Sequence, residues 1–425
     1  IGVDEEGGSV TRLERGTGST VPGAAQLGAI DDVEVTAAVG AELARRLRAV
    51  GANAELGPVA DVNTNPGNPV IGVRAFGADA ELVARHALAM IGGIQGGAVA
   101  ACAKHFPGHG DTNLDSHHAL PEISLDVDEY ERVHLEPFRL AVEAGVDMIM
   151  TAHIVVPAWG EAPATLNPRI LGILRDWGFD GVIVTDALDM AAIRESVGIG
   201  GGAVQALAAG ADLLCIGNPT NPGPAAAPDQ DERDFHAARD AIVDALRDGS
   251  LSVERVREAA ARVSALGAKL AAAAAAGIAD DAEAGVDRVS GRAVTVRGAL
   301  SATDGPLAVI DARRRSTLAV DTAADFATEI LRDGGSVTRV DATAPNVQVE
   351  PAVDATAVVV VDGPLLTAAQ RAAIDGAAGG SAVVVNVGLP IDDQLPLPVI
   401  DVRASNRGGV AAALSLIRGS AGGAV

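Results

Sequence analysis

The sequence predicts an α/β protein, a (β/α)8 TIM-type barrel followed by a smaller α/β sandwich domain. Two observations predict this fold: short apolar runs rich in β-branched residues alternate with segments of helical periodicity, and polar residues follow the runs in the first part of the chain. The composition changes at 272–286, where alanine and aspartate dominate. We therefore expect a barrel domain at 1–271, a linker at 272–286 and a sandwich domain at 287–425.

Six runs in the first part are typical of buried parallel strands, at 1–3, 51–59, 98–103, 146–152, 181–185 and 211–217. Segments between them, such as 35–51 and 129–145, carry apolar residues every three to four positions and end on a glycine, which commonly stops a helix. A closed barrel of this type has eight strands. The missing strands are expected upstream of residue 1, which would leave the barrel incomplete at the N-terminus, or in stretches whose pattern is weak.

The ends of these six runs all carry polar side chains. In chain order these are Asp4 and Glu5, Asp61 and Asn63, Lys104 and His105, then His153, Asp186 and Asn218. Repetition at every strand end indicates one shared site at the carboxyl-terminal face of a barrel. A doubly wound open sheet would instead gather its ligand at a single switch point.

A second series of strand-like runs follows the linker, at 306–312, 336–341, 356–362, 381–388 and 398–403. These runs alternate with helix-like segments and predict the small sandwich domain. Their ends carry few histidines or paired polar groups, so we expect no chemistry there.

Composition limits the partners of the chain. Its formal charge of −24, its pI near 4.6 and an aromatic content of 2% argue against nucleic acid. No run reaches the roughly 18 apolar residues of a membrane span. Cys102 and Cys215 lie in apolar runs and are expected to be buried thiols. No signal peptide is visible, so a cytoplasmic location is expected, although a segment upstream of residue 1 would escape notice.

The stretch "KHFPGHGDTNLDSHH", 104–118, holds four of the eight histidines. Three interpretations compete: a metal site, acid–base chemistry or a solvated polar loop. His105 and His109 have the spacing of a zinc pair on a helix, but Pro107 and Gly108 lie between them and oppose a helix. We therefore expect neither a metal nor a cofactor, and a structural role for His109 and His118. His86 and His134, in predicted helices, are expected to be solvated.

Five motifs appear in order: "IGVDEEGGSVTRL", "ADVNTNPGNPVIGVRAFG", "KHFPGHGDTNLDSHHALP", "MTAHI" and "GVIVTDALDM". Together they resemble the β-N-acetylhexosaminidases (β-N-acetylglucosaminidases) of glycoside hydrolase family 3, over roughly 1–220. The "KHFPGHG…DSH" element separates this branch from the β-glucosidases of the family. One departure is Ala187, where members often have a second polar residue.

The resemblance implies a retaining mechanism with Asp186 as nucleophile, His117 as general acid/base and Asp115 as its partner. Taken from the residues alone, Asp186 is also a candidate cap for the next helix. Histidine can replace the usual carboxylic acid because its ordinary pKa lies near 6.5. Gly108 and Gly110 predict a loop that swings over the substrate.

The resemblance also implies a set of sugar ligands: Asp4, Arg12, Arg74, Lys104, His105 and His153. The alternative for each is an ion pair at the barrel rim, and for His153 a buried hydrogen-bond network. The implied activity is exo-acting release of terminal GlcNAc from an oligosaccharide or a muropeptide, as in cell wall recycling. Two alternatives stay open, a GlcNAc-transferring phosphorylase and a non-catalytic carbohydrate-binding homologue.

Overall fold

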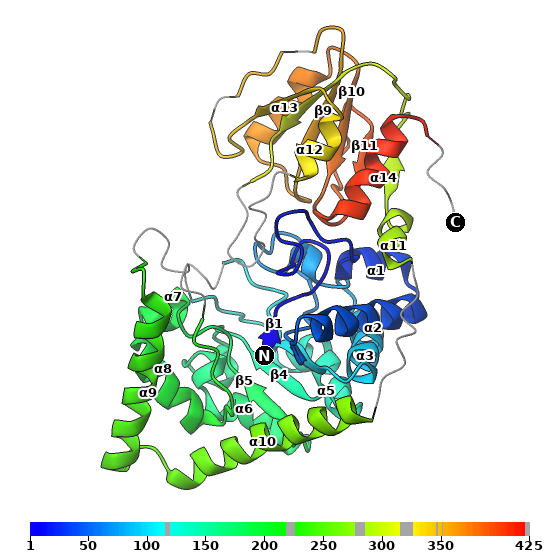
Figure 1. The fold of residues 1–425 in the computed structure, drawn as a ribbon. Coiled ribbons are helices and arrows are strands. Elements are labelled where there is room, and N and C mark those ends of the chain that lie inside the picture. Colours follow the sequence, from blue (N-terminus) through cyan, green and yellow to red (C-terminus); the bar gives the residue numbers. More distant parts are fainter. Residues whose placement is uncertain are drawn as a thin grey trace. The chain divides into compact units, whose positions relative to one another are not determined.

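A computed structural model of the chain describes residues 1–114, 120–217, 226–276, 285–314, 326–345, 347–350 and 352–420 (Figure 1). The chain divides into two compact units. The first contains Ile1–Val3, Thr36–Ile71 and Ala78–Ala282, and the second contains Asp4–Val35, Gly72–Gly77 and Glu283–Val425. The second unit therefore combines two N-terminal segments with the C-terminal part of the chain. The predicted domain boundaries at 271 and 287 stay predictions.

The first unit is built on a parallel sheet in chain order. Its strands are β1 (Gly2–Val3), β2 (Ala54–Glu55), β3 (Ala100–Phe106), β4 (Met148–Thr151) and β5 (Val182–Val184). The register pairs Gly2 with Ala54, Ala54 with Ala100, Cys102 with Met148 and Met148 with Val182. The α/β class and five of the predicted strands are therefore confirmed.

The sixth run, 211–217, meets the sheet only through one parallel bridge between Val184 and Leu213. Side chains replace part of the backbone ladder here: the Asp212 carboxylate accepts the Ile183 N–H at 3.1 Å, and the Thr185 hydroxyl accepts the Cys215 N–H at 2.9 Å. Five named strands lie in the described part of this unit, so a closed barrel of eight strands stays a prediction.

Helices follow the strands as predicted. They are α2 (Val33–Ala49), α3 (Ala80–Gly96), α4 (Val127–Tyr130), a π-helix (Glu131–Leu135), α5 (Glu136–Glu143), α6 (Pro168–Asp176), α7 (Ala191–Arg194), α8 (Gly198–Ala209), α9 (Gln230–Asp248) and α10 (Val253–Ala275). Gly145, two residues after α5, has a φ of 77°, the left-handed conformation that favours glycine and stops a helix. Because α10 runs to Ala275, the first residues of the expected linker are helical, and 277–284 lie outside the described residues.

Apolar side chains of β3, β4 and β5 form the core of this unit, with contributions from α10. Buried members include Ala100, Cys102, Met148, Val182 and Leu270. Cys102 is buried as predicted, whereas Cys215 is only half-buried. One face of the core is closed by a charge cluster in which Arg175, Arg255 and Arg262 all bind the buried Asp212 carboxylate. This cluster ties α6 and α10 to the end of β5.

The second unit holds a six-stranded sheet in the order β6-β11-β10-β9-β7-β8. The strands are β6 (Thr295–Arg297), β7 (Leu307–Asp311), β8 (Ser336–Arg339), β9 (Thr356–Val361), β10 (Ala382–Asn386) and β11 (Val399–Asp401). The last five match the predicted runs and are parallel. The edge strand β6, which is antiparallel, was not predicted.

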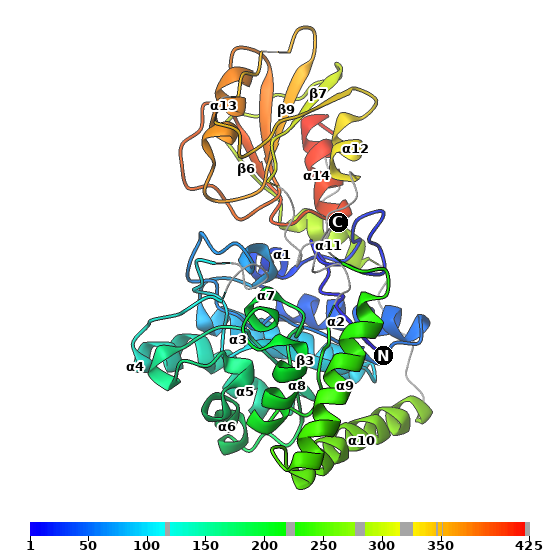
Figure 2. The same ribbon diagram turned by 90° about the vertical axis from the view of Figure 1, so that its left-hand side faces the viewer.

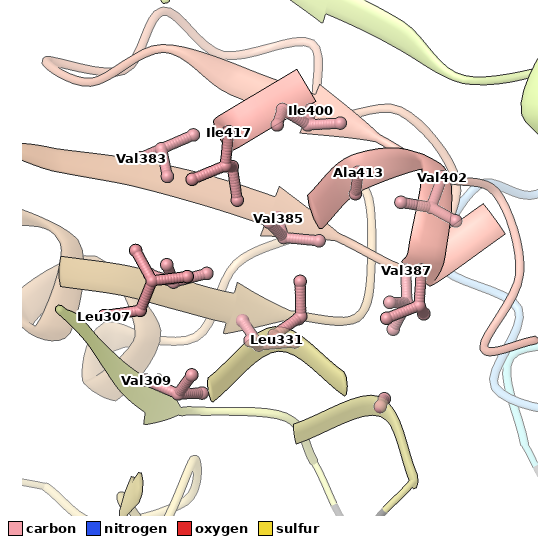
Figure 3. Close-up of a cluster of buried hydrophobic side chains, with 14 residues drawn as sticks. Leu307, Val309, Leu331, Val383, Val385, Val387, Ile400, Val402, Ala413 and Ile417 are labelled. Atoms are coloured by element: carbon pink, nitrogen blue, oxygen red, sulfur yellow. The ribbon is translucent and has the colours of Figure 1, made fainter. Parts of the chain in front are cut away.

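Helices cover both faces of this second sheet (Figures 1 and 2). Residues of α12 (Phe326–Arg332) and α14 (Arg407–Ile417) pack on one face, where Leu331, Ala413 and Ile417 meet Val385 and Ile400 (Figure 3). Residues of α13 (Ala368–Ala377) pack on the other face. The unit also contains α1 (Ala24–Ile30), a 3₁₀ helix (Gly72–Arg74) and α11 (Val286–Arg292). Across the described ranges, no helix combines the length and apolarity that crossing a membrane requires.

Candidate functional site

Polar side chains gather where the strands of the first unit end. Asp61 lies beyond β2, Lys104 and His105 lie in the last half of β3, His153 follows β4 by two residues, and Asp186 follows β5 by two residues. The carboxyl ends of neighbouring parallel strands meet at one edge of a sheet, so these residues share that edge. Lys104 and His105 are both buried there. Asn218, the predicted polar end of the sixth run, lies outside the described residues.

Asp186 is half-buried, and its Oδ1 atom accepts the N–H of Ala187 at 2.8 Å. The helix that follows, α7, begins only at Ala191 and has Met190 as its N-cap, without a side-chain bond. Asp186 therefore does not cap this helix, and that interpretation of its carboxylate is wrong. The carboxylate is instead oriented locally, by the backbone of the next residue.

His153 binds the carbonyl group of the same residue, Ala187. It is fully buried, its Nε2 lies 2.8 Å from the carbonyl oxygen of Ala187, and its Nδ1 lies 2.8 Å from the hydroxyl of Thr165. A carbonyl only accepts, so Nε2 carries a proton and donates it to Ala187. Both ring nitrogens thus bind protein atoms. These contacts favour the hydrogen-bond-network interpretation of His153, and its role as a sugar ligand stays a prediction.

Asp61 organises the histidines of the third strand end. It is fully buried, its Oδ1 accepts the backbone N–H groups of His105 at 3.1 Å and His109 at 2.7 Å, and its Oδ2 lies 2.7 Å from Nδ1 of His105. Burial raises the pKa of Asp61, but attraction and hydrogen bonding from the two histidines outweigh burial and lower the pKa below its ordinary value. A charged carboxylate thus fixes the ring of His105.

The contacts of His109 are those of a buried, hydrogen-bonded side chain, and its structural role stays a prediction. Its Nδ1 lies 2.9 Å from the hydroxyl of Thr112, and Asn68 donates to its carbonyl oxygen at 2.9 Å. Burial lowers the pKa of His109 to about 4, against the opposing attraction of Asp61 and of Asp186.

Gly108 and Gly110 serve close packing. A Cβ on Gly110 would lie 1.8 Å from the carbonyl oxygen of Val62, and one on Gly108 would lie 2.9 Å from Cβ of His134. The hydroxyl of Tyr130 also donates to the carbonyl of Gly108 at 3.0 Å. The start of the predicted swinging loop is therefore anchored at these two glycines, and the swing itself stays a prediction.

The acid/base candidates cannot be placed in this site. Asp115, His117 and His118 all lie outside the described residues, as does the part of the loop that carries them. Their roles stay predictions based on the "DSH" motif.

Two other histidines differ from expectation. His86 is fully buried in α3 and lies 2.8 Å from the Thr36 hydroxyl of α2 through Nδ1. His134 is buried in the π-helix against the ring of Tyr130, with 5.1 Å between ring centroids. The prediction that both are solvated is wrong, because each lies on the core-facing side of its helix.

The remaining sugar-ligand candidates lie in the second unit. Arg12 Nη2 lies 3.1 Å from Asp4 Oδ2, and both side chains are partly exposed. Arg74 is buried and makes a two-point contact with Glu6, from Nε at 3.0 Å and from Nη2 at 2.7 Å. The ion-pair interpretation therefore describes both arginines, while their roles toward a sugar stay predictions.

Glu5 shapes the segment between Asp4 and Arg12. Its buried carboxylate accepts the Thr11 hydroxyl at 2.6 Å and the N–H groups of Arg12 at 2.6 Å and Leu13 at 3.0 Å. Burial raises the pKa of Glu5 despite these hydrogen bonds. The sequence marked Glu5 only as a strand end, and its partners six to eight residues away gave no recognisable signal.

The pKa of His109 leads to a stability prediction. Between pH 6.5 and about 4 the unfolded chain binds one more proton at this position than the folded chain, so stability rises with pH across this window. The difference corresponds to about 3 kcal/mol of unfolding free energy. Urea unfolding at pH 7 and pH 4 should show His109→Asn losing about 3 kcal/mol less than the natural protein. Half-buried His236 on α9 provides the control, His236→Asn, and parallel losses in all three proteins would contradict the assignment.

Comparison with known proteins identifies a family that matches this chain. The family described as "Glycosyl hydrolase family 3 N terminal domain" matches residues 1–266. A solved glycoside hydrolase family 3 β-N-acetylglucosaminidase from Paenibacillus sp. str. FPU-7 is 33% identical, with a TM-score of 0.81 over 99% of this chain and 84% of that one.

Two curated relatives are also similar. Beta-hexosaminidase A of Pseudoalteromonas piscicida is 34% identical over 290 residues, which cover 64% of this chain and 47% of the relative. A beta-hexosaminidase of Neisseria meningitidis serogroup C (strain 053442) is 39% identical over 228 residues, which cover 51% of this chain and 62% of the relative. The chain thus spans about half to three fifths of the length of these two relatives.

Proposed function

The chain belongs to glycosyl hydrolase family 3, and from this premise we propose that it is a retaining, exo-acting β-N-acetylglucosaminidase. The substrate class is an oligosaccharide or muropeptide with a terminal GlcNAc. The observation that carries the proposal is Asp186, a half-buried carboxylate beyond β5 whose Oδ1 atom is held by the backbone of Ala187. The names of the similar proteins, β-hexosaminidases and a β-N-acetylglucosaminidase, support the choice of sugar.

The proposed reaction has two displacements. In the first, Asp186 attacks the anomeric carbon, the bond to the leaving oxygen breaks, and His117 gives that oxygen a proton. In the second, His117 takes a proton from water, the water oxygen attacks the anomeric carbon, and the ester to Asp186 breaks. Asp115 would hold the second ring nitrogen of His117, as the aspartate of a triad orients its histidine.

The proposed sugar contacts come from residues suited to hydroxyl groups. Lys104 and His105 are buried donors at the end of β3, and Asp61 fixes the ring of the histidine. Asp4, Arg12 and Arg74 are proposed ligands on the strength of the motifs alone. We also propose that 1–271 forms a (β/α)8 barrel and 287–425 an α/β sandwich, and that the protein is cytoplasmic.

Product analysis tests this function. Proton NMR during the cleavage of chitotriose and longer chitooligosaccharides should show β-GlcNAc as the first free monosaccharide, with one sugar lost at a time. Early α-GlcNAc would overturn the retaining mechanism, and internal cleavage would overturn exo action. A parallel reaction in millimolar phosphate decides the phosphorylase alternative, because phosphorolysis yields GlcNAc-1-phosphate instead of free GlcNAc. Complete inactivity on every GlcNAc glycoside would favour the non-catalytic alternative.

A further inference from the structure

The loop between Asp4 and Arg12, called here the ligand loop (Asp4–Leu13), belongs to the second unit together with the C-terminal part of the chain. Within the loop, Glu5 binds Thr11, Arg12 and Leu13, which brings Arg12 to 3.1 Å from Asp4. The loop therefore has a defined shape. The contacts that hold this loop from outside come from residues almost 400 positions further along the chain.

The outer side of the ligand loop rests directly on the turn after β11. The hydroxyl of Ser9 accepts the N–H of Ser405 at 2.9 Å. Gly8 is pressed against Gly23 and Ala404: a Cβ on Gly8 would lie 2.5 Å from Cα of Gly23 and 3.6 Å from Cβ of Ala404. The N–H of Gly8 is taken by the carbonyl of Val21 at 2.9 Å. The loop thus packs at backbone distance against Gly23 and contacts the turn after β11 through Ser9 and the Ala404 side chain.

A pair of buried amide side chains, Asn406 and Gln26, joins the turn after β11 to helix α1. Asn406 is fully buried and donates from Nδ2 to Gln26 Oε1 at 3.0 Å and to Ser290 Oγ at 2.8 Å. Gln26 is also fully buried, donates to the carbonyl of Val402 at 3.0 Å, and accepts the N–H of Gly23 at 3.0 Å. The Oδ1 atom of Asn406 meanwhile caps α14 through the N–H of Gly409 at 3.1 Å.

These contacts are costly to break because buried polar groups need their partners. Loss of the Asn406 amide removes one of the two donors to Gln26 Oε1 and the donor to Ser290, which loosens the turn at Ala404–Asn406 that fixes Ser9. The start of α14 and the ligand loop therefore share one hydrogen-bond network, in which each side limits the movement of the other.

We infer that the C-terminal domain is a positioning element for sugar binding, and that it acts by holding the ligand loop through Asn406, Gln26 and Ser405. This gives the domain a role although its own strand ends carry no predicted chemistry. The inference rests on the proposed function, because it takes Asp4 and Arg12 as sugar ligands. Asn406 is a positioning residue here and touches no substrate.

Two variants of the whole chain test the inference. Asn406→Asp keeps the oxygen that caps α14 and removes the amide donor, while Ser9→Ala removes the acceptor at the contact itself. Each should raise KM for chitobiose about tenfold with kcat changed less than about threefold. The double variant should raise KM by less than the product of the two, because both act through one contact.

Thr367→Ala is the matched control. Thr367 caps α13 on the other face of the same sheet, through the N–H of Gln370 at 3.2 Å, so its loss also destabilises the domain. Its KM should not change. Hydrogen exchange supplies a readout without substrate: the amides of Arg12 and Leu13 should exchange faster in Asn406→Asp and not in Thr367→Ala.

The outcomes separate the inference from the function on which it rests. Unchanged exchange at Arg12 and Leu13 overturns the mechanical link. Faster exchange with unchanged KM overturns the role in sugar binding. If the natural protein cleaves no GlcNAc glycoside, the proposed function fails, and the exchange data alone still decide whether the C-terminal domain holds the loop.

Discussion

Replacement of Asp186 by asparagine is expected to lower the cleavage of GlcNAc glycosides by about 10³-fold or more, because an amide cannot form the glycosyl ester. The fold should not change, since the asparagine oxygen can still accept the N–H of Ala187, which lies 2.8 Å from Oδ1 of Asp186. Steady-state rates on chitobiose measure the loss. A slow-reacting fluorinated GlcNAc analogue should label the natural protein on the peptide that contains Asp186.

Asp180→Asn is the control for this variant, because Asp180 is exposed just before β5, at the opposite end of the same strand. It undergoes the same chemical change and should keep full activity. A label on Asp4, Asp61 or Asp115 would contradict the assignment, and so would an Asp186→Asn protein that retains more than a few per cent of the rate.

The environment of Asp186 suggests why the residue after it tolerates alanine. The backbone of Ala187 makes both relevant contacts, with its N–H to Asp186 and its carbonyl to His153. Neither contact uses a side chain at position 187. The absence of a polar side chain at position 187 therefore does not remove the backbone contacts that hold the Asp186 carboxylate.

Strands could be predicted from the sequence because burial on both faces leaves a short, continuous apolar run. The run at 356–362 became β9 (Thr356–Val361), whose residues are all buried. The run at 211–217 failed as a strand because Asp212 and Thr185 supply side-chain bonds to the backbone where a ladder would otherwise form. These side-chain bonds join residues about 30 positions apart, so they leave no periodic pattern in the sequence.

Partners distant in sequence account for most of what was missed in the site. Asp61 holds His105 and His109 from 44 and 48 residues away, and Thr36 binds His86 from 50 residues away. Gln26 and Asn406 are separated by 380 residues. Each of these residues looks like an ordinary polar position until the fold brings its partner close. The residue types at the strand ends were enough to predict chemistry there. The contacts that support these residues could be identified only from the structure.

The glycines of the histidine-rich stretch show the same limit. A glycine in a polar loop is compatible with a hinge and also with close packing, and the sequence does not separate the two. Gly110 lies so close to Val62 that any side chain would clash, and Gly108 packs on His134. The start of this loop, at Gly108 and Gly110, is therefore anchored.

Replacement of His117 by alanine should lower the rate on substrates with a poor leaving group far more than the rate on substrates with a good one. A general acid contributes about 10²–10⁴-fold when the leaving oxygen is a poor leaving group. We therefore expect a loss of that size on chitobiose, whose leaving group is a sugar hydroxyl. On nitrophenyl GlcNAc the first step should slow by less than about tenfold, because nitrophenolate departs without a proton. Hydrolysis of the ester still needs a base, so the variant should release one equivalent of nitrophenol in a burst and then turn over slowly.

His118→Ala is the matched control, because it removes the neighbouring ring from the same loop and is expected to affect both substrates little. The burst makes the test independent of folding: a variant that had merely lost structure would show neither a burst nor a selective loss on chitobiose. Equal losses on the two glycosides would assign His117 a structural role.

The choice of histidine as acid/base also bears on which acceptor can take the sugar. A glutamate, after donating its proton, would leave a negative charge beside an incoming anion, whereas histidine becomes neutral in that step. In the natural protein, the breakdown of the ester on Asp186 should therefore accelerate with phosphate if phosphate can also accept the sugar.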